Sequence, residues 1–407
     1  MKYFPLICLL ALCITACRSP QESDSMILAN ILQGQGELFE EVRLNSKKYR
    51  LQILYTQIDR EADQSPRFTS YGYRTNHESY FYPASTVKMP AALLALEKLN
   101  HLGIDPYTPM LTDSAAPGQT RVLTDSSAES LLPSVAHYAR KVFLVSDNDA
   151  FNRLYEFLGQ EALNDSLRQK GYQDTRIVHR LSIALNETQN ATSNPIKFMV
   201  ADSIVYQQDL AHNDKIYWED QPMALGKGEI RGQKLIEEPK DFARKNFFPL
   251  HEQQQMLRAI FFPEQAGKYG FELRPEDYNF LYRAMGERPR ESAYPQYDDS
   301  VYYDGYVKFF MYGDTQDTIP DHIRIFNKVG FAYGFLTDNA YIIDLENGIE
   351  FMLSATLWVN ENQIFNDDQY EYEQIGFPFL AQLGWAVYDY ELKRARKVKP
   401  DLSKFWP

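Results

Sequence analysis

The sequence predicts an α+β fold in which one antiparallel sheet is built from both chain ends and an all-helical lobe is inserted between them. Three observations predict it. Residues 48–59 alternate between apolar and polar side chains, residues 124–170 read as helices, and strand-like runs return within 340–358. Strands that enclose helices in this order favour a sheet shared by the two ends of the chain.

The first part of the chain predicts a helix over 27–42 and then strands. The alternation along 48–59 is that of a strand with one buried face, and short strands are expected at 68–73 and 79–82. Residues 89–99 are apolar on nearly every side, so we expect a buried helix there. Because Pro90 is tolerated only near a helix start, this helix should begin close to Ser85.

The last part of the chain predicts a return to strands. A strand is expected at 323–328, and Glu346-Asn347-Gly348 lies between apolar runs at 340–344 and 349–358. Asn-Gly between two such runs is a strong signal for a hairpin. Residues 367–395 then predict a closing helix.

Composition excludes some classes of function. The formal net charge of the 407 residues is −13, which argues against nucleic-acid binding and against electrostatic docking on anionic lipid. A basic cluster at 393–399 is interpreted as a solvated tail. The 28 tyrosines are interpreted as half-buried packing residues, and no site is assigned to them.

The N-terminus predicts export. Lys2 precedes an apolar stretch at 3–12 that is too short to span a membrane, and Ala16-Cys17 follows. A small residue before Cys resembles the lipobox of bacterial lipoproteins, which implies cleavage of a 1–16 signal peptide and lipidation of Cys17. The alternatives are an ordinary signal peptide and a single anchor helix.

The predicted lipidation has consequences for location and for chemistry. Residues 17–27 read as a polar tether, and the protein is expected to be exported and anchored to a membrane of the cell envelope. The other cysteines, Cys8 and Cys13, lie in the segment to be removed. No thiol then remains for a disulfide, a zinc site or a catalytic cysteine.

Three short motifs carry the chemistry. Ser85 and Lys88 lie three residues apart and share a helix face, where a lysine of lowered pKa can take the proton of a serine hydroxyl. The alternative is a lysine that extends to solvent from the helix end. Ser146-Asp147-Asn148 could equally cap a helix, and Lys328-Val329-Gly330 alone could be a charged residue and a turn.

The order of these motifs resembles the class A β-lactamases and the penicillin-binding proteins, over roughly residues 45–390. The surrounding Tyr82-Pro83-Ala84 is also typical of that superfamily. The resemblance implies a β-lactamase/transpeptidase-like fold, a single catalytic domain at 28–407, and neither a metal nor an organic cofactor.

The resemblance also implies roles for individual residues. The catalytic set is Ser85 as nucleophile, Lys88 as base and Ser146 as proton relay. Lys328 is expected to lower the pKa of Lys88 and to attract a substrate carboxylate, and the N–H groups of Ser85 and Phe331 to form the oxyanion hole. The substrate-binding set is Asn148, Lys328, Gly330 and Phe331.

The chain departs from the family pattern at the residue expected to release the acyl group. In the omega-loop-like stretch Arg180 and Asn186 are present, but Ser182 stands where class A enzymes carry a glutamate that activates water. A serine is no general base near neutral pH without help. Glu187 is close in sequence, but we expect it to point elsewhere.

Two further departures concern the substrate. Val329 replaces the hydroxyl residue that helps to bind a β-lactam carboxylate, and a family-atypical insert lies within about 200–320. The sequence therefore predicts a serine hydrolase that forms an acyl-enzyme on β-lactams or peptidoglycan-like amides and releases it slowly. The alternatives are a non-hydrolytic penicillin-binding or sensor protein, and an envelope scaffold of the same fold.

Overall fold

The structure is a computed structural model that describes residues 26–75, 80–116, 118–218 and 221–405. The predicted signal peptide at 1–16 and Cys17 lie outside the described residues, as does nearly all of the predicted tether. The boundaries of these segments and of the 28–407 domain stay predictions.

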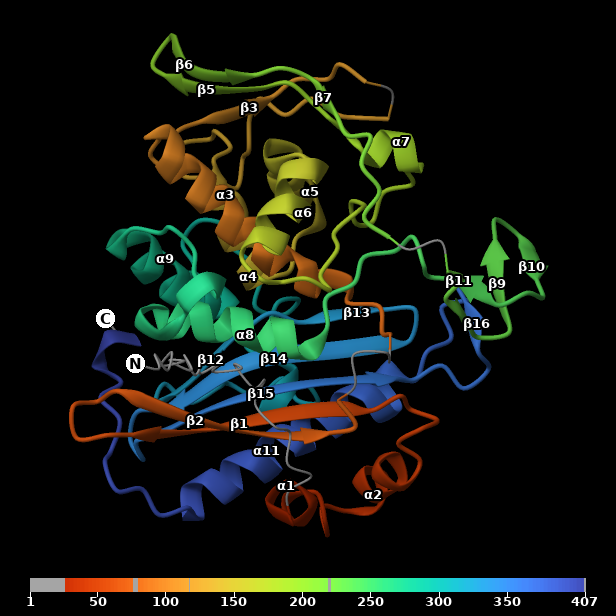
Figure 1. Cartoon of the computed structure of the whole chain (residues 1–407), viewed down its shortest axis with the longest axis vertical. Helices are drawn as coiled ribbons and strands as arrows, with labels where there is room; N and C mark the ends of the chain where they lie inside the picture. Colours follow the sequence, from red (N-terminus) through yellow and green to blue (C-terminus); the bar gives the residue numbers. More distant parts are fainter. Residues whose placement is uncertain (1–25, 76–79, 117, 219–220, 406–407) are drawn as a thin grey trace, which may run out of the picture.

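A central antiparallel sheet draws on both chain ends, as predicted (Figure 1). Its register pairs Gln52 with Thr356 and Ile53 with Tyr73, so the first strand lies between an early and a late neighbour. In spatial order the strands are β12 (Ile323–Asn327), β14 (Phe335–Asp344), β15 (Ile349–Trp358), β1 (Gln52–Arg60) and β2 (Pro66–Tyr73), with β13 (Gly330–Ala332) paired to β14.

The predicted hairpin joins β14 to β15. The Asp344 carboxylate accepts hydrogen bonds from the backbone N–H groups of Glu346, at 2.9 Å, and of Asn347, at 3.0 Å. Gly348 has φ 63°, a left-handed conformation that glycine adopts without a steric cost. The hairpin predicted from Asn347-Gly348 is therefore confirmed.

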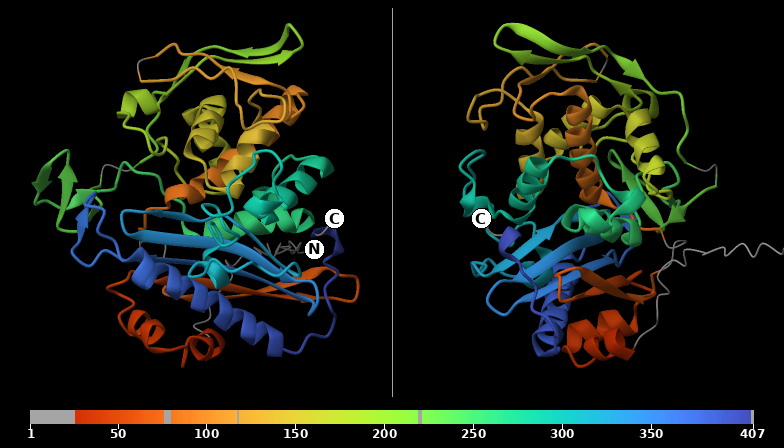
Figure 2. Two further views of the ribbon diagram at one scale, coloured as in Figure 1. Left: turned by 180° about the vertical axis from the view of Figure 1, so that it is seen from behind. Right: turned by 60° about the vertical axis from the view of Figure 1, so that its left-hand side comes forward.

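Helices cover both faces of the sheet (Figures 1 and 2). The C-terminal helix packs on one face, with the two N-terminal helices beside it, over an apolar cluster that includes Leu353 and Leu380. The predicted 27–42 helix is two helices separated at Gly36, which has φ 107°. The closing helix begins later than predicted because a π-helical turn precedes it. These elements are α1 (Met26–Ile31), α2 (Glu37–Leu44), the π-helix Tyr372–Gly376 and α11 (Phe377–Lys393).

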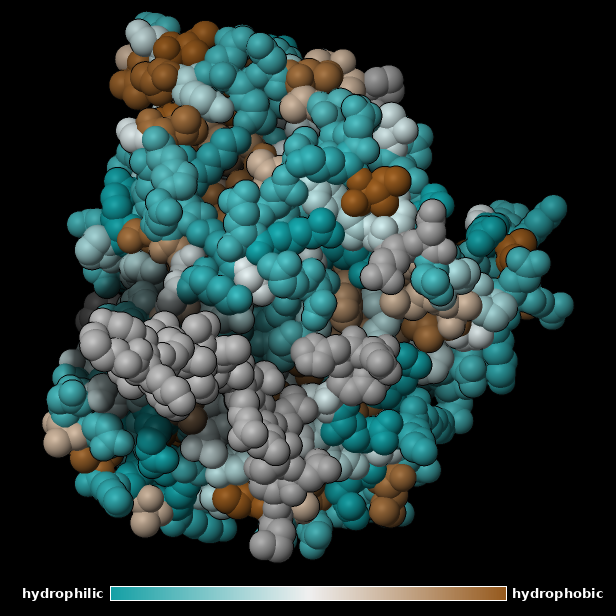
Figure 3. Space-filling view, in the orientation of Figure 1, coloured by the Kyte–Doolittle hydropathy of each residue, from teal (hydrophilic) through white to brown (hydrophobic). Residues whose placement is uncertain are grey.

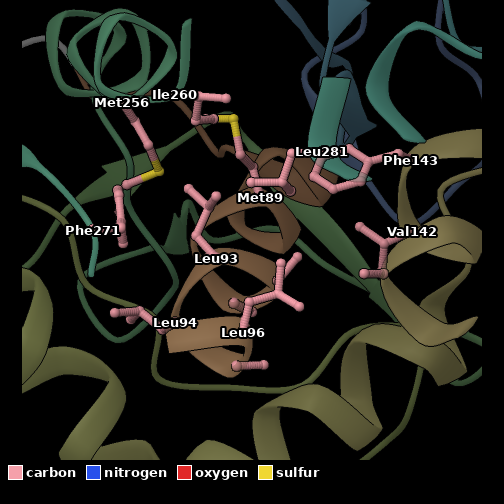
Figure 4. Close-up of a cluster of buried hydrophobic side chains, with 14 of the residues drawn as sticks. Met89, Leu93, Leu94, Leu96, Val142, Phe143, Met256, Ile260, Phe271 and Leu281 are labelled. Atoms are coloured by element: carbon pink, nitrogen blue, oxygen red, sulfur yellow. The ribbon is translucent and has the colours of Figure 1, made fainter. Parts of the chain in front are cut away.

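The opposite face carries the lobe. Its central helix, α3 (Lys88–Leu102), is buried on most sides, and Figure 4 shows Leu93 and Leu96 of this helix among side chains from the helices around it. The lobe is not purely helical, because a small antiparallel sheet lies across its outer end. The helices around α3 are α4 (Val135–Leu144), α5 (Asn148–Leu158), α6 (Gln160–Gln169), α8 (Leu250–Phe261) and α9 (Pro275–Gly286). The strands of the small sheet are β3 (Met110–Thr112), β5 (Ile196–Val200) and β6 (Ser203–Gln208).

The elements of the 200–320 stretch are distributed over different parts of the molecule. It supplies α8 and α9 between sheet and lobe, and short strands at the flank. Tyr80–Tyr82 form no strand, contrary to prediction. The remaining short elements are α7 (Glu187–Asn190), α10 (Phe309–Tyr312), β4 (Thr192–Ser193), β7 (Ala211–His212), β8 (Ala224–Leu225), β9 (Gly228–Arg231), β10 (Lys234–Ile236), β11 (Lys240–Asp241) and β16 (Ile364–Phe365). Single turns of 3₁₀-helix lie at Ala84–Val87, Pro263–Gln265, Gly267–Tyr269, Pro289–Glu291 and Ser403–Phe405.

The surface is largely hydrophilic on the face shown in Figure 3, with hydrophobic side chains gathered over the outer end of the lobe. Val200, Ile204 and Val205 of the β5–β6 hairpin are at least half exposed there. Within the described ranges, no helix combines the length and the apolar character needed to cross a membrane.

Candidate active site

Ser85 lies in the 3₁₀ turn Ala84–Val87 that leads directly into α3, close to the helix start predicted from Pro90. The preceding Ala84 is held at φ 46°, in the left-handed region that a residue with a Cβ atom rarely adopts. Strain of this kind persists only where the surrounding structure enforces it, and it concentrates at functional sites. The side chain of Ser85 is partly exposed and lines a cleft between the lobe and the sheet.

Lys88 is fully buried one turn after Ser85. Its ammonium nitrogen donates to Asn148 Oδ1 at 2.7 Å, lies 3.3 Å from Ser146 Oγ, and also contacts the Ser146 carbonyl. The lysine does not extend to solvent from the helix end, which was the alternative interpretation of the motif.

Burial lowers the pKa of Lys88 to about 7, and the carboxylate of Asp147 opposes this shift. Lys328 is also buried, and its pKa is lowered well below the usual range first by burial and then by Lys88. The sequence predicts that Lys328 is the group that lowers the pKa of Lys88. Desolvation is the main cause instead, and the two lysines together make it costly for both to carry a charge.

Acylation of Ser85 is expected to increase as pH rises through about 7. The pKa of Lys88 lies below that of a free lysine, so above about 7 the amine is mostly neutral and able to accept the serine proton. Below that pH the rate constant should fall about tenfold per unit. The check is the second-order rate constant of Ser85 labelling by an acylating probe between pH 5 and 9. A flat profile, or a midpoint near 10, would contradict this assignment.

Ser146 and Asn148 lie in the loop between α4 and α5. Ser146 has φ 59°, and Asp147 caps α5 by accepting from the Ala150 N–H at 2.8 Å. The capping interpretation of this motif therefore holds for Asp147, whereas its two neighbours face the lysines. Ser146 Oγ lies between them, since Lys328 Nζ donates to it at 2.8 Å. A hydroxyl with an amine on each side can relay a proton.

Gly330 brings the late strand β13 against the nucleophile turn. A Cβ atom there would lie 2.4 Å from the Pro83 carbonyl oxygen and 2.8 Å from the Ser85 nitrogen. Both contacts are with backbone atoms, so only glycine allows this approach. Phe331 follows, and its half-exposed ring lines the cleft with Ser85. The structure thus brings together all seven residues that the sequence assigns to catalysis and substrate binding.

Of the three omega-loop-like residues, one lies at the cleft and two lie away from it. Ser182 lines the cleft at φ 53°, and its Oγ accepts from Asn148 Nδ2 at 2.8 Å. Arg180 is buried away from the cleft, 3.2 Å from the Glu156 carboxylate. Asn186 caps α7 and lines a different pocket.

Glu187, the nearest acidic residue in sequence, does not replace the missing glutamate. Its carboxylate pairs with Arg244 at 3.0 Å, is more than half exposed, and faces the same outer pocket as Asn186. This matches the expectation that it points elsewhere. No described carboxylate accepts a hydrogen bond from Asn148, at the point where Ser182 does.

The cleft has a volume of about 680 Å³ and a wall that the sequence did not predict. Tyrosines from the 200–320 stretch line it, together with residues of the π-helix before α11, although no site was assigned to the tyrosines from the sequence. A run of four tyrosines at 297–306 was the available signal. The aromatic residues that line the cleft are Tyr82, Tyr302, Tyr303, Tyr306, Phe309, Phe331, Tyr333, Tyr372 and Phe377.

A buried polar cluster holds this wall in place. Lys308 Nζ donates at 2.8 Å to Asn327 Oδ1 and to the Met285 and Ile325 carbonyls. The Asp338 carboxylate accepts from the N–H groups of Phe309 and Phe310, both at 3.1 Å. Burial lowers the pKa of Lys308 to about 7 and raises that of Asp338 to about 6. Strand β12, which ends directly before Lys328, and strand β14 therefore anchor this part of the 200–320 stretch.

A family model matches the part of the chain that carries Ser85, Lys88 and Ser146. Residues 40–215 match the model of the β-lactamase enzyme family. A search of curated proteins gives no match.

Among solved structures, the chromosome-encoded β-lactamase of Vibrio parahaemolyticus is 14% identical with a TM-score of 0.48, over 88% of this chain and 100% of that one. A β-lactamase from Desulfarculus baarsii is 14% identical with a TM-score of 0.47, over 91% and 98%. The protein PBP-A is 15% identical with a TM-score of 0.49, over 89% and 96%.

Proposed function

We propose that this chain is a β-lactamase-like serine hydrolase, since its residues 40–215 match the model of the β-lactamase enzyme family, and that Ser85 is the nucleophile of an acyl-transfer site. In this proposal Ser85 Oγ attacks an acyl carbon and Lys88 accepts the hydroxyl proton. Ser146 then passes a proton to the leaving nitrogen or oxygen. The product of the first half-reaction is an ester on Ser85, formed on β-lactams or on amides of the peptidoglycan type.

The observation that carries the proposal is the placement of Lys88. This buried lysine lies one turn after Ser85, its nitrogen donates to Asn148 at 2.7 Å, and Lys328 donates at 2.8 Å to Ser146 beside it, at the cleft that Ser85 lines. Its desolvation costs free energy that an apolar residue would not. A pKa of about 7 makes it suitable for accepting a proton at neutral pH.

We propose further that the ester is released slowly. Hydrolysis needs a base within hydrogen-bond distance of the attacking water. The position next to Asn148 holds the hydroxyl of Ser182, and the Glu187 carboxylate is paired elsewhere. In this proposal the residues needed for acylation are all present, whereas deacylation lacks a base for the attacking water.

The test is intact-protein mass spectrometry of the domain from about residue 24, mixed with benzylpenicillin or a serine-reactive phosphonate and sampled over time. We expect an adduct of one probe mass that persists for hours on the wild type and is missing from Ser85→Ala. If Ser85→Ala is labelled equally, the nucleophile is wrong. If neither probe labels the wild type, the acyl-transfer proposal is wrong.

A second candidate function is supported by Ser182. A protein that is acylated and stays acylated acts as a penicillin-binding or sensor protein rather than as a hydrolase. Loss of the drug from solution in excess over protein would favour the hydrolase, and consumption of one equivalent would favour the sensor.

We also propose that the mature chain is lipidated at Cys17 and held at a membrane of the cell envelope. The first described helix begins at Met26, which leaves a short polar linker after Cys17. Cys17→Ala should abolish incorporation of labelled palmitate in bacterial cells and release the domain from the membrane fraction.

A further inference from the structure

One wall of the cleft is aromatic and is assembled from three separate segments of the chain. Tyr302 and Tyr306 of the insert contact each other with ring centroids 4.8 Å apart. Phe331 beside the nucleophile turn lies 5.3 Å from Tyr372 and 5.7 Å from Phe377. These rings leave flat apolar surface open to the cleft, since Tyr306 is 36% and Phe331 50% exposed. Such a wall suits an aromatic group on the ligand.

The cleft presents no cation to a ligand. Among the described residues that line it, none is lysine, arginine or histidine. Lys88 and Lys328 lie behind Ser146 with their nitrogens already bound, Lys328 donating to Ser146 Oγ at 2.8 Å and to the Val329 carbonyl at 3.0 Å. Burial lowers the pKa of both lysines.

The charges that the cleft does present are negative. Asp147 lines it, but this carboxylate caps α5 and has Lys141 Nζ 3.5 Å away. Glu373, on the π-helix Tyr372–Gly376, also lines the cleft, is exposed, and forms no ion pair with a described residue. Its charge is therefore uncompensated at the cleft.

The position next to Lys328 offers no hydroxyl either. Val329 is 2% exposed and packs in the apolar cluster between the sheet and α11. A valine is favoured there by its surroundings, and it cannot donate a hydrogen bond to a carboxylate. Taken with the charges, this leaves a carboxylate on the ligand with no cation among the described lining residues, and without the hydroxyl that a serine or threonine at position 329 would supply.

We propose that this cleft selects acyl donors that carry an aromatic ring and lack a carboxylate, with the aromatic wall binding the ring and Glu373 repelling anions. The inference rests on the proposed function of Ser85 and narrows its substrate class to neutral or cationic aromatic esters and amides. In the reaction, Ser85 Oγ bonds to the carbonyl carbon, the bond to the leaving oxygen or nitrogen breaks, and that atom takes the serine proton.

The test compares benzylpenicillin with its methyl ester, two compounds with the same ring system and aromatic group that differ in one carboxylate. The readout is the rate constant of adduct formation on Ser85 by mass spectrometry. We expect the methyl ester to react at least about threefold faster at low ionic strength, and the ratio to shrink in 1 M salt, where charges are screened over about 3 Å.

Two pairs of variants assign the effect to its residues. Glu373→Gln should raise the rate with benzylpenicillin by about threefold and leave the methyl ester unchanged, whereas Glu129→Gln, which removes an exposed charge outside the cleft, should change neither. Tyr306→Leu should lower the rate constant for both compounds by about three- to tenfold. Tyr306→Phe keeps the aromatic ring and should not lower it.

The outcomes separate the two proposals. A faster reaction with benzylpenicillin than with its ester, or a Glu373→Gln variant that leaves their ratio unchanged, overturns the selectivity while Ser85 remains the nucleophile. If benzylpenicillin, its ester and the phosphonate all fail to label Ser85, the acyl-transfer function itself fails and the selectivity fails with it.

Discussion

Lys88→Met is expected to slow acylation of Ser85 by about 100- to 10,000-fold, the range that a positioned general base contributes. Methionine fills the same buried space without an amine, so the hydroxyl proton has no acceptor at the point where Lys88 Nζ now contacts Asn148 and Ser146. The melting temperature should change by less than about 5 °C, because removing a desolvated amine offsets the hydrogen bonds that are lost.

Lys98→Met is the matched control. Lys98 lies on the same helix, its pKa is lowered by burial to about 8, and its nitrogen donates to Gln208 Oε1 at 2.7 Å, outside the cleft. This variant should label at the wild-type rate. Labelling of Lys88→Met at more than a tenth of the wild-type rate, with the fold intact by circular dichroism, would show that another group takes the proton.

Ser182→Glu is expected to speed release of the acyl group by about 100-fold or more. Ser182 lines the same cleft as Ser85, and its Oγ lies 2.8 Å from Asn148 Nδ2, so a glutamate here places a carboxylate in the cleft that holds the ester. The residue already holds φ 53° with a Cβ atom, and another side chain adds little backbone strain there. The measurement is the decay of the benzylpenicillin adduct after removal of free drug.

Ser182→Gln separates base catalysis from a change of shape. Glutamine has the size of glutamate but cannot accept a proton near neutral pH, so its adduct should decay as slowly as that of the wild type. If both variants accelerate release equally, the effect is one of packing or water access. If neither does, the alignment of Ser182 with the family glutamate is wrong.

The architecture was predictable where the sequence signal is local. The alternation along residues 48–59 predicts β1, the Asn-Gly turn after Asp344 predicts the hairpin of β14 and β15, and the order of the elements predicts a sheet from both ends. The break between α1 and α2 depends on a positive φ at Gly36, and the strands of the lobe depend on long-range pairing of Met110 with Phe198. Neither follows from periodicity.

The site, like the fold, was predictable only where short motifs in the sequence mark it. Ser85, Lys88 and Ser146 stand in motifs of fixed spacing, and this spacing places them together. The aromatic wall has no such motif, because Tyr306 and Tyr372 come from segments 66 residues apart that meet only through tertiary packing. Asn186 is held on the outer side of the loop by a capping box, and Glu187 is held there by its ion pair with Arg244.

The pairing of β1 with β15 sets an order of events in the synthesis of the chain. The β1–β2 hairpin can form early, but its other edge has no partner until roughly 300 more residues have been made, which takes ~15–60 s at ~5–20 residues per second. An unpaired strand edge invites association with other chains for all of that time. Lys328 and Gly330 are made just before β15, so Ser85 and Lys88 are synthesised long before the site is complete, and a chain that ends early carries both residues without the lysine and the glycine that lie against them.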